Sequence, residues 1–277
     1  MSSDSNGRNT DSSEAGAASA ALEPRSNARM ATAWGAARDA LAAVRNLEAL
    51  LRNTAVPRST ISDLLTELRS SASALRVAVE RPLGSDAATC GVGQYGSARV
   101  TELDELLSSL GEGLGDRTAR AERAAVLADE LDASVDLLAL LDRAAAPSAT
   151  EVTLDLVARE VGRMSGSARG REVIVRFDEA QPDCAAVTDP YVLGPLLALL
   201  VACVQASGVD ALVLHARCSP RPQFVVEGLR PGDASLPTMP IRVMPWIPPS
   251  EAAARRVAAH LGATIDLGPG RGSIVVG

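Results

Sequence analysis

Apolar residues recur at alternating three- and four-residue steps along the first part of this chain. One run passes through Met30, Trp34, Ala37, Leu41, Val44 and Leu51, and a second through Ile61, Leu65, Leu68, Ala72, Leu75 and Val79. This spacing places apolar side chains along one side of helices that pack lengthwise on each other. Pro57 lies between the runs and ends the first helix, so the pair is predicted to form an antiparallel hairpin.

Two further helices are predicted before residue 147. Their apolar positions are Val100, Leu103, Leu106, Leu107 and Leu110 in one helix, and Leu127, Leu131, Leu138 and Leu141 in the next. Aromatic residues make up only 2% of the chain, so its cores must be built from Leu, Val and Ala, which favours helices packed on helices. We therefore expect a helical hairpin or bundle over residues 28–147. The seams suit either dimerisation or a monomeric four-helix bundle.

The segment Pro82–Ser97 is predicted to be a loop between helices. Within it, Gly91–Gly96 reads GxGxxG, a pattern also found in dinucleotide-binding folds. Such a site requires a strand immediately before the glycines, and Leu83–Cys90 is polar and turn-like. We interpret the glycines as part of a flexible connection.

Composition excludes several classes of function. The net charge is -7, which argues against nucleic acid as a partner because a phosphate backbone calls for a basic face. The chain contains no lysine, so Walker-type loops and Schiff bases are excluded. With two histidines and no CxxC pair, a metal site is not expected.

The remaining composition suggests a cytoplasmic protein. Residues 1–27 are rich in Ser, Ala and Asn and are predicted to be a disordered tail without a signal sequence. The longest apolar run, Tyr191–Val204, is too short for the roughly 20 residues of a membrane span. We expect all four cysteines to be reduced thiols.

Periodicity changes after the short linker Pro147–Thr150. Strands are predicted at Glu172–Phe177, Ala185–Thr188, Ala211–Cys218, Phe224–Glu227, Thr264–Leu267 and Ser273–Val276, and helices at Thr153–Met164, Pro190–Ala206 and Ser250–Leu261. Strands interleaved with a few helices indicate an α+β fold with two layers. The predicted second domain spans residues 151–277.

Several motifs in this second domain occur in a familiar order. Thr188-Asp189-Pro190 is followed by leucines at the spacing D-P-x-x-L-x-x-L-L, Ala253–Gly262 reads AARRVAAHLG, and Gly270–Ser273 reads GRGS. Together they resemble the ATP-binding domain of sensor histidine kinases, the Bergerat fold shared with Hsp90 and gyrase. The helical hairpin before it looks like the dimerisation region of that family.

The chain departs from this family wherever ATP and magnesium would bind. The resemblance places Cys203 at the position of the magnesium-binding asparagine, and a thiol is a poor magnesium ligand. Glu227-Gly228 stands where a D-x-G-x-G turn would contact adenine, and the glycine spacing differs. No glycine lies between Gly232 and Gly262, where a phosphate loop should close, and prolines around Trp246 occupy that segment.

The phosphoacceptor histidine is also missing, because both histidines lie beyond residue 200. The resemblance therefore implies a pseudokinase: a dimeric scaffold or regulator in two-component signalling that binds a response-regulator receiver domain or a partner kinase, with no cofactor. Candidate partner-binding residues are Trp34, Arg38, Leu41, Arg45 and Trp246, while Cys203, Glu227, Gly228, Gly270 and Gly272 are vestigial nucleotide positions.

Two alternatives remain open. One is a divergent but active kinase or ATPase that binds Mg-ATP through Glu227 and Gln205; the other is a coiled-coil assembly protein. Trp246 either fills the vacated nucleotide pocket or presents an exposed anchor to a partner. His215 is interpreted as a packed or surface residue of a strand, and His260 as a framework residue.

Overall fold

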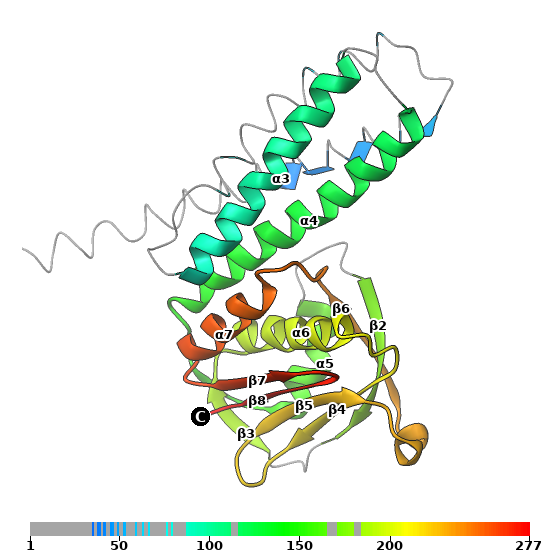
Figure 1. Cartoon of the computed structure of the whole chain (residues 1–277). Helices are drawn as coiled ribbons and strands as arrows, with labels where there is room; N and C mark the ends of the chain where they lie inside the picture. The colour runs from blue at the N-terminus through cyan, green and yellow to red at the C-terminus, as the bar shows by residue number, and fades with distance from the viewer. Residues whose placement is uncertain are drawn as a thin grey trace, which may run out of the picture.

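The computed structural model describes residues 87–111, 116–164, 171–179 and 184–277, together with scattered positions between 35 and 79. The predicted tail, residues 1–27, lies outside the described residues. A helical arm stands on a compact part made of helices and strands (Figure 1). The predicted α+β class is therefore confirmed. Among the described helices, none is both long enough and apolar enough to cross a lipid bilayer.

Two long helices build the described core of the arm. Helix α3 spans Ala87–Gly111 and α4 spans Arg117–Ala144. Asp116 caps α4, since its carboxylate accepts a hydrogen bond from the Thr118 N–H at 2.8 Å. The helices pack through fully buried leucines, which include Leu103, Leu107, Leu127 and Leu131. The predicted leucine seams are thus the packing faces of α3 and α4.

The prediction of a loop at Pro82–Ser97 is wrong for its described part, because α3 begins at Ala87 and includes Gly91–Gly96. A Cβ added to Gly96 would lie 2.9 Å from Val79 Cγ1, and one added to Gly93 would lie 2.7 Å from the Val79 carbonyl oxygen. These two glycines therefore let another helical segment approach α3 closely, and tertiary packing outweighs their low helix propensity.

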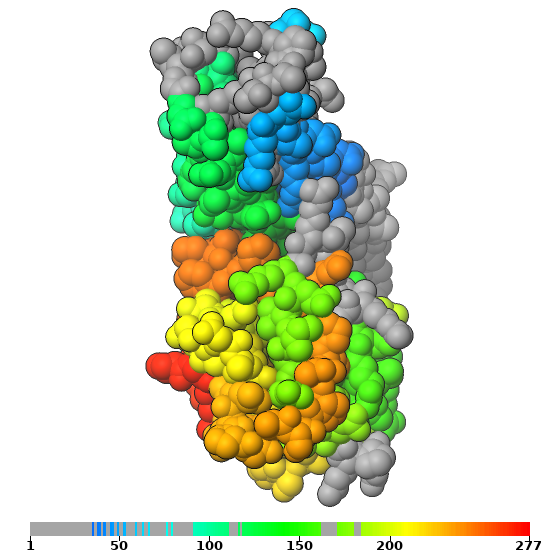
Figure 2. All heavy atoms as spheres, turned by 90° about the vertical axis from the view of Figure 1, so that its right-hand side faces the viewer, coloured from blue at the N-terminus to red at the C-terminus, as the bar shows by residue number. Residues whose placement is uncertain are grey.

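Residues from the first part of the chain pack against α3 and α4. Leu41 and Val79 are both buried. Arg45 Nη2 lies 2.7 Å from Asp132 Oδ2 on α4, and Arg76 bonds Asp104 on α3 at the same distance. Figure 2 shows the blue N-terminal residues against the green helices. The contacts of a helical bundle are thus formed within one chain.

The second part contains the following elements in chain order. They are β1 (Thr150–Thr153), α5 (Leu154–Met164), β2 (Arg171–Asp178), β3 (Ala185–Thr188), α6 (Pro190–Ala206), β4 (Leu212–Arg217), β5 (Gln223–Gly228), the 3-10 helix η1 (Pro231–Ser235), β6 (Thr238–Val243), α7 (Ser250–His260), β7 (Thr264–Gly268) and β8 (Arg271–Val275). The larger sheet has the order β6-β2-β4-β5-β8-β7, and only β2 and β4 run parallel among its described pairs. Strands β1 and β3 form a separate antiparallel pair.

Helices α5, α6 and α7 lie on one face of the larger sheet, which gives the predicted two layers (Figure 1). Helix α6 begins as expected at Pro190, because Asp189 accepts a hydrogen bond from the Tyr191 N–H at 2.9 Å and proline fits the first helical turn. Most of α6 is buried between the sheet and α7. It is the central helix of the core.

Two features correct the expectations from sequence. Thr238–Val243 forms strand β6 at the edge of the sheet, where no strand was predicted. Pro240 is compatible with a strand there, because an edge strand leaves one side of its backbone unpaired. In addition, Cys184 and Cys218 are joined by a disulfide, so the expectation of reduced thiols is wrong for this pair.

The arm contacts the second part at a defined junction. Helix α7 touches both α3 and α4. The Arg143 guanidinium, near the end of α4, lies 4.8 Å from the centre of the Tyr191 ring. The Ser148 N–H in the linker donates to Asp189 Oδ2 at 2.9 Å. The same aspartate therefore starts α6 and holds the linker.

Candidate functional site

Cys203, the residue at the expected magnesium position, lies near the end of α6 and is 9% exposed. Burial, and then the nearby Glu251 carboxylate, raise the pKa of its thiol to about 12, although Arg255 acts in the opposite direction. At neutral pH the side chain is therefore an uncharged thiol. Such a group binds hard cations poorly.

Glu227 lies on strand β5, and the sheet register fixes the direction of its side chain. Its neighbour Val226 pairs with Gly272 on β8, and a Cβ at Gly272 would lie 2.5 Å from Leu200 Cδ1 of α6. That face of the sheet therefore packs against α6. Because successive side chains of a strand alternate between faces, Glu227 points to the opposite face.

On that face Glu227 belongs to a charged cluster across four adjacent strands, β2, β4, β5 and β8. Its carboxylate lies 3.5 Å from His215 Nε2, 3.1 Å from Arg230 Nη2 and 3.6 Å from Arg271 Nε. His215 Nδ1 lies 2.8 Å from Asp178 Oδ2. The Glu227 side chain is only 9% exposed. Its charge thus has cationic partners, Arg230 and Arg271, on the face of the sheet opposite α6.

The histidine of this cluster was interpreted from sequence simply as a packed or surface residue. It is buried, which agrees with packing, but it also links Asp178 on β2 to Glu227 on β5. Within the described part of the chain, His215 Nε2 is buried and has no hydrogen-bond partner. No signal in the sequence indicated this cluster. Its residues come together only because β2, β4, β5 and β8 are neighbours in the sheet, and this order cannot be read from the sequence.

The glycines at the predicted nucleotide positions, Gly228, Gly270 and Gly272, have different structural roles. Gly270 has a φ of +69° in the turn between β7 and β8, a conformation that glycine adopts at little cost, and its N–H donates to Ser207 Oγ at 2.9 Å. Gly272 allows α6 to approach the sheet. At Gly228 a Cβ would lie 3.5 Å from Val209 Cγ1, an ordinary contact. Turn geometry and packing therefore account for Gly270 and Gly272.

The segment expected to replace the phosphate loop is part of the fold. After β6 the chain buries Met244 and Ile247, and the Ile247 N–H donates to Ser250 Oγ at 3.0 Å at the start of α7. Trp246 is 43% exposed. The interpretation that Trp246 fills a vacated pocket is wrong, since Met244 and Ile247 are the buried side chains here.

The candidate partner-binding residues of the arm are placed as follows. Trp34 lies outside the described residues. Leu41 is fully buried, and Arg45 is largely buried between Asp132 and Asp129 of α4. Arg38 is half-exposed and lies 3.6 Å from Asp136. Leu41 and Arg45 therefore pack within the chain.

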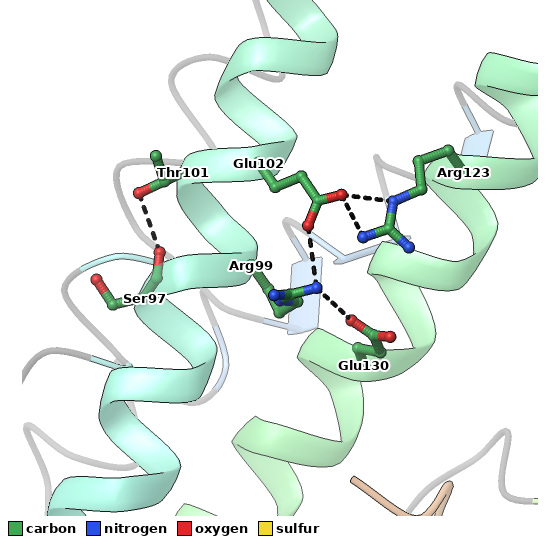
Figure 3. Close-up of polar contacts among 6 residues, drawn as sticks. All are labelled: Ser97, Arg99, Thr101, Glu102, Arg123 and Glu130. Carbon is green, nitrogen blue, oxygen red and sulfur yellow. Dashed lines mark hydrogen bonds and ion pairs between the residues drawn. The ribbon is translucent and has the colours of Figure 1, made fainter. Parts of the chain in front are cut away.

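An ion-pair network joins α3 to α4 and was missed by the sequence analysis (Figure 3). Arg99 Nη1 lies 3.0 Å from Glu102 Oε2 and 3.4 Å from Glu130 Oε2, and Arg123 pairs with the same Glu102. The Arg99 guanidinium lies over the Tyr95 ring, with its central carbon 5.1 Å from the centre of that ring. Burial, followed by the charge of Glu130 and a hydrogen bond to it, raises the pKa of Tyr95. The network thus adds ion pairs to the apolar contact between the two helices.

The described residues thus define a two-layer α+β protein with a helical arm, in which Cys203, Glu227, Gly270 and Gly272 have structural partners. Among known proteins, no family model matches this chain, and no curated protein matches it significantly.

Proposed function

We propose that this protein is a non-catalytic, histidine-kinase-like scaffold or regulator of two-component signalling, whose second domain is a degenerate Bergerat-type domain. The order of its elements supports this proposal. An Asp-Pro pair starts the buried helix α6, α7 follows the edge strand β6, and the β7–β8 hairpin turns at Gly270. These are the segments on which the resemblance rests.

The observation that carries the proposal is the position of Glu227. A carboxylate that recognises adenine must be available to the nucleotide, whereas this one is buried beside His215, Arg230 and Arg271. Turning it toward a nucleotide would break its ion pair with Arg230 and remove it from its place beside His215. Two further observations support a non-catalytic protein: the thiol of Cys203 is buried, and Thr238–Val243 forms a strand of the sheet instead of a phosphate-binding loop.

The proposed partner is a receiver domain or a partner kinase. Trp246 is an exposed candidate anchor, and it lies between β6 and α7, a helix that contacts the arm. Exposed tryptophans are frequent hot spots of protein interfaces. A homodimer stays a prediction, and the contacts of Leu41 and Val79 within the chain also suit a monomeric bundle.

Calorimetric titration of the full chain with Mg-ATP at millimolar concentration tests the absence of nucleotide binding. We expect no saturable heat, and clear saturation would overturn this part of the proposal.

Capture of purified receiver domains on the immobilised protein tests the partner. Trp246→Ala should weaken capture by about tenfold or more if Trp246 is the anchor. Leu229→Ala removes another exposed apolar side chain and serves as the matched control. Failure of every receiver domain and of every purified histidine kinase to bind would refute the assignment to two-component signalling.

A further inference from the structure

The small sheet β1–β3 begins directly after the linker that follows the arm helix α4. Thr150 pairs with Thr188 at one end, and Thr153 pairs with Ala185 at the other. Each strand has four residues, and an isolated pair of such strands is at best marginally stable in water. The groups that hold its two ends therefore decide whether it persists.

Asp189 holds the end nearer the arm. It directly follows β3 and is buried. Its Oδ2 accepts the Ser148 N–H of the linker, and its Oδ1 accepts the Tyr191 N–H of α6, both at 2.9 Å. If β3 left its place, Asp189 would move with it, and the linker would lose its hydrogen bond from Ser148.

The disulfide holds the other end. Cys184 immediately precedes β3, and its carbonyl oxygen accepts the Leu154 N–H at 2.9 Å. Its sulfur is bonded to Cys218, which directly follows β4 of the larger sheet. Cys184 is buried, whereas Cys218 is partly exposed. A thiolate arriving from solvent would therefore reach the Cys218 sulfur first.

We propose that the Cys184–Cys218 pair is a reversible oxidation site that sets how firmly β1 and β3 hold the arm to the α+β layer. The oxidant is a small-molecule disulfide such as oxidised glutathione. The Cys218 thiolate attacks one of its sulfurs and releases one small thiol. The Cys184 thiolate then attacks the Cys218 sulfur of the mixed disulfide and releases the second.

The exchange is balanced. Two electrons pass from the protein thiols to the small disulfide, and their two protons end on the two released thiols. Reduction runs in reverse, with the first attack at Cys218 and Cys184 as the leaving thiolate. In the reduced state β3 keeps Asp189 but loses its covalent tie to β4. This inference does not depend on the proposed function.

The test uses the full chain equilibrated in mixtures of reduced and oxidised glutathione. After denaturation and alkylation, mass spectrometry should count alkyl groups on all four cysteines in the reduced state, and on Cys90 and Cys203 alone in the oxidised state. Hydrogen exchange is then compared over residues 148–156 and 184–190. We expect these amides to exchange about tenfold or more faster in the reduced protein, because an opening of β3 is no longer restrained. Amides of α3 should not change.

Two variants control the experiment. Cys218→Ser should exchange like the reduced protein in either buffer, whereas Cys203→Ser should respond to glutathione as the wild type does. Equal exchange of residues 148–156 and 184–190 in the two redox states would overturn the proposal. A pair that stays in one state across the whole glutathione range would overturn it as well.

Discussion

Substituting the glycines of α3 one at a time tests whether the GxGxxG segment serves helix packing. Gly91 meets no atom within 4 Å among the described contacts, so Gly91→Ala should only relieve the low helix propensity of glycine. That change should stabilise the protein by about 0.5–1 kcal/mol. It is the matched control, because it makes the same change in the same helix.

The two neighbouring glycines should respond differently. The methyl group of Gly96→Ala would lie 2.9 Å from Val79 Cγ1, and overpacking of this kind costs about 1–3 kcal/mol. After the propensity gain of about 1 kcal/mol, the net loss is between about 0 and 2 kcal/mol. Gly93→Ala meets the Val79 carbonyl oxygen at 2.7 Å, so the backbone itself must move. We expect the larger loss there.

Val79→Ala separates the two cases. In that background Gly96→Ala should cost less, because Val79 Cγ1 is gone although the Cβ of residue 79, 3.1 Å away, remains. Gly93→Ala should stay as unfavourable as before, because the carbonyl oxygen that it meets is unchanged. Urea unfolding followed by far-ultraviolet circular dichroism measures each variant and each double mutant. Equal effects at the three glycines, or no rescue of Gly96→Ala by Val79→Ala, would refute the packing explanation.

Three further outcomes are expected. The pKa of the Cys203 thiol is about 12 instead of 9.0, and only a thiolate reacts with iodoacetamide. At pH 8, Cys203 should therefore be labelled roughly a thousandfold more slowly than a thiol of ordinary pKa. Rapid labelling of the native protein would contradict the burial of Cys203. Glu227→Ala should lower the unfolding free energy by about 1–3 kcal/mol, since His215 loses a charged neighbour inside the sheet, and an unchanged urea midpoint would show that the cluster is not stabilising. Gly272→Ala should cost about 1–3 kcal/mol through its contact with Leu200 Cδ1, and combining it with Leu200→Ala should make the two losses less than additive.

The helices and strands that were predicted correctly are those whose capping and turn residues lie next to them in the sequence. Helix α6 was predicted at its observed bounds because Asp189 and Pro190 form a cap and a first turn. Helix α7 and the β7–β8 hairpin were predicted within a few residues for similar reasons. In these segments the local preference and the tertiary environment agree.

The errors arose where distant residues decide the local structure. The glycines of α3 read as a loop, but Val79 requires small residues on a helix at that place. Strand β6 was not predicted; it contains Pro240 and lies at an edge of the sheet, where proline fits. The Cys184–Cys218 disulfide joins residues 34 positions apart, a proximity that their spacing alone does not reveal.

The candidate site shows the same division. Sequence located Cys203 on a buried helix and Glu227 at the end of a strand, and both placements are confirmed. It could not show that Glu227 faces away from α6, since that depends on the register between β5 and β8. A shift of one residue in that register would send the side chain to the other face.

Strand β6 has a consequence for motion. It pairs with β2 along its length: Val243 lies opposite Arg171 at one end, and Thr238 lies opposite Arg176 at the other. Its Ile241 and Val243 side chains are buried. A flexible loop can open and close on its own, whereas this segment can leave its place only by breaking a sheet edge and exposing part of the core. We therefore expect the β6 amides that bond β2 to exchange only when this edge of the sheet opens, and more slowly than the amides of a free loop.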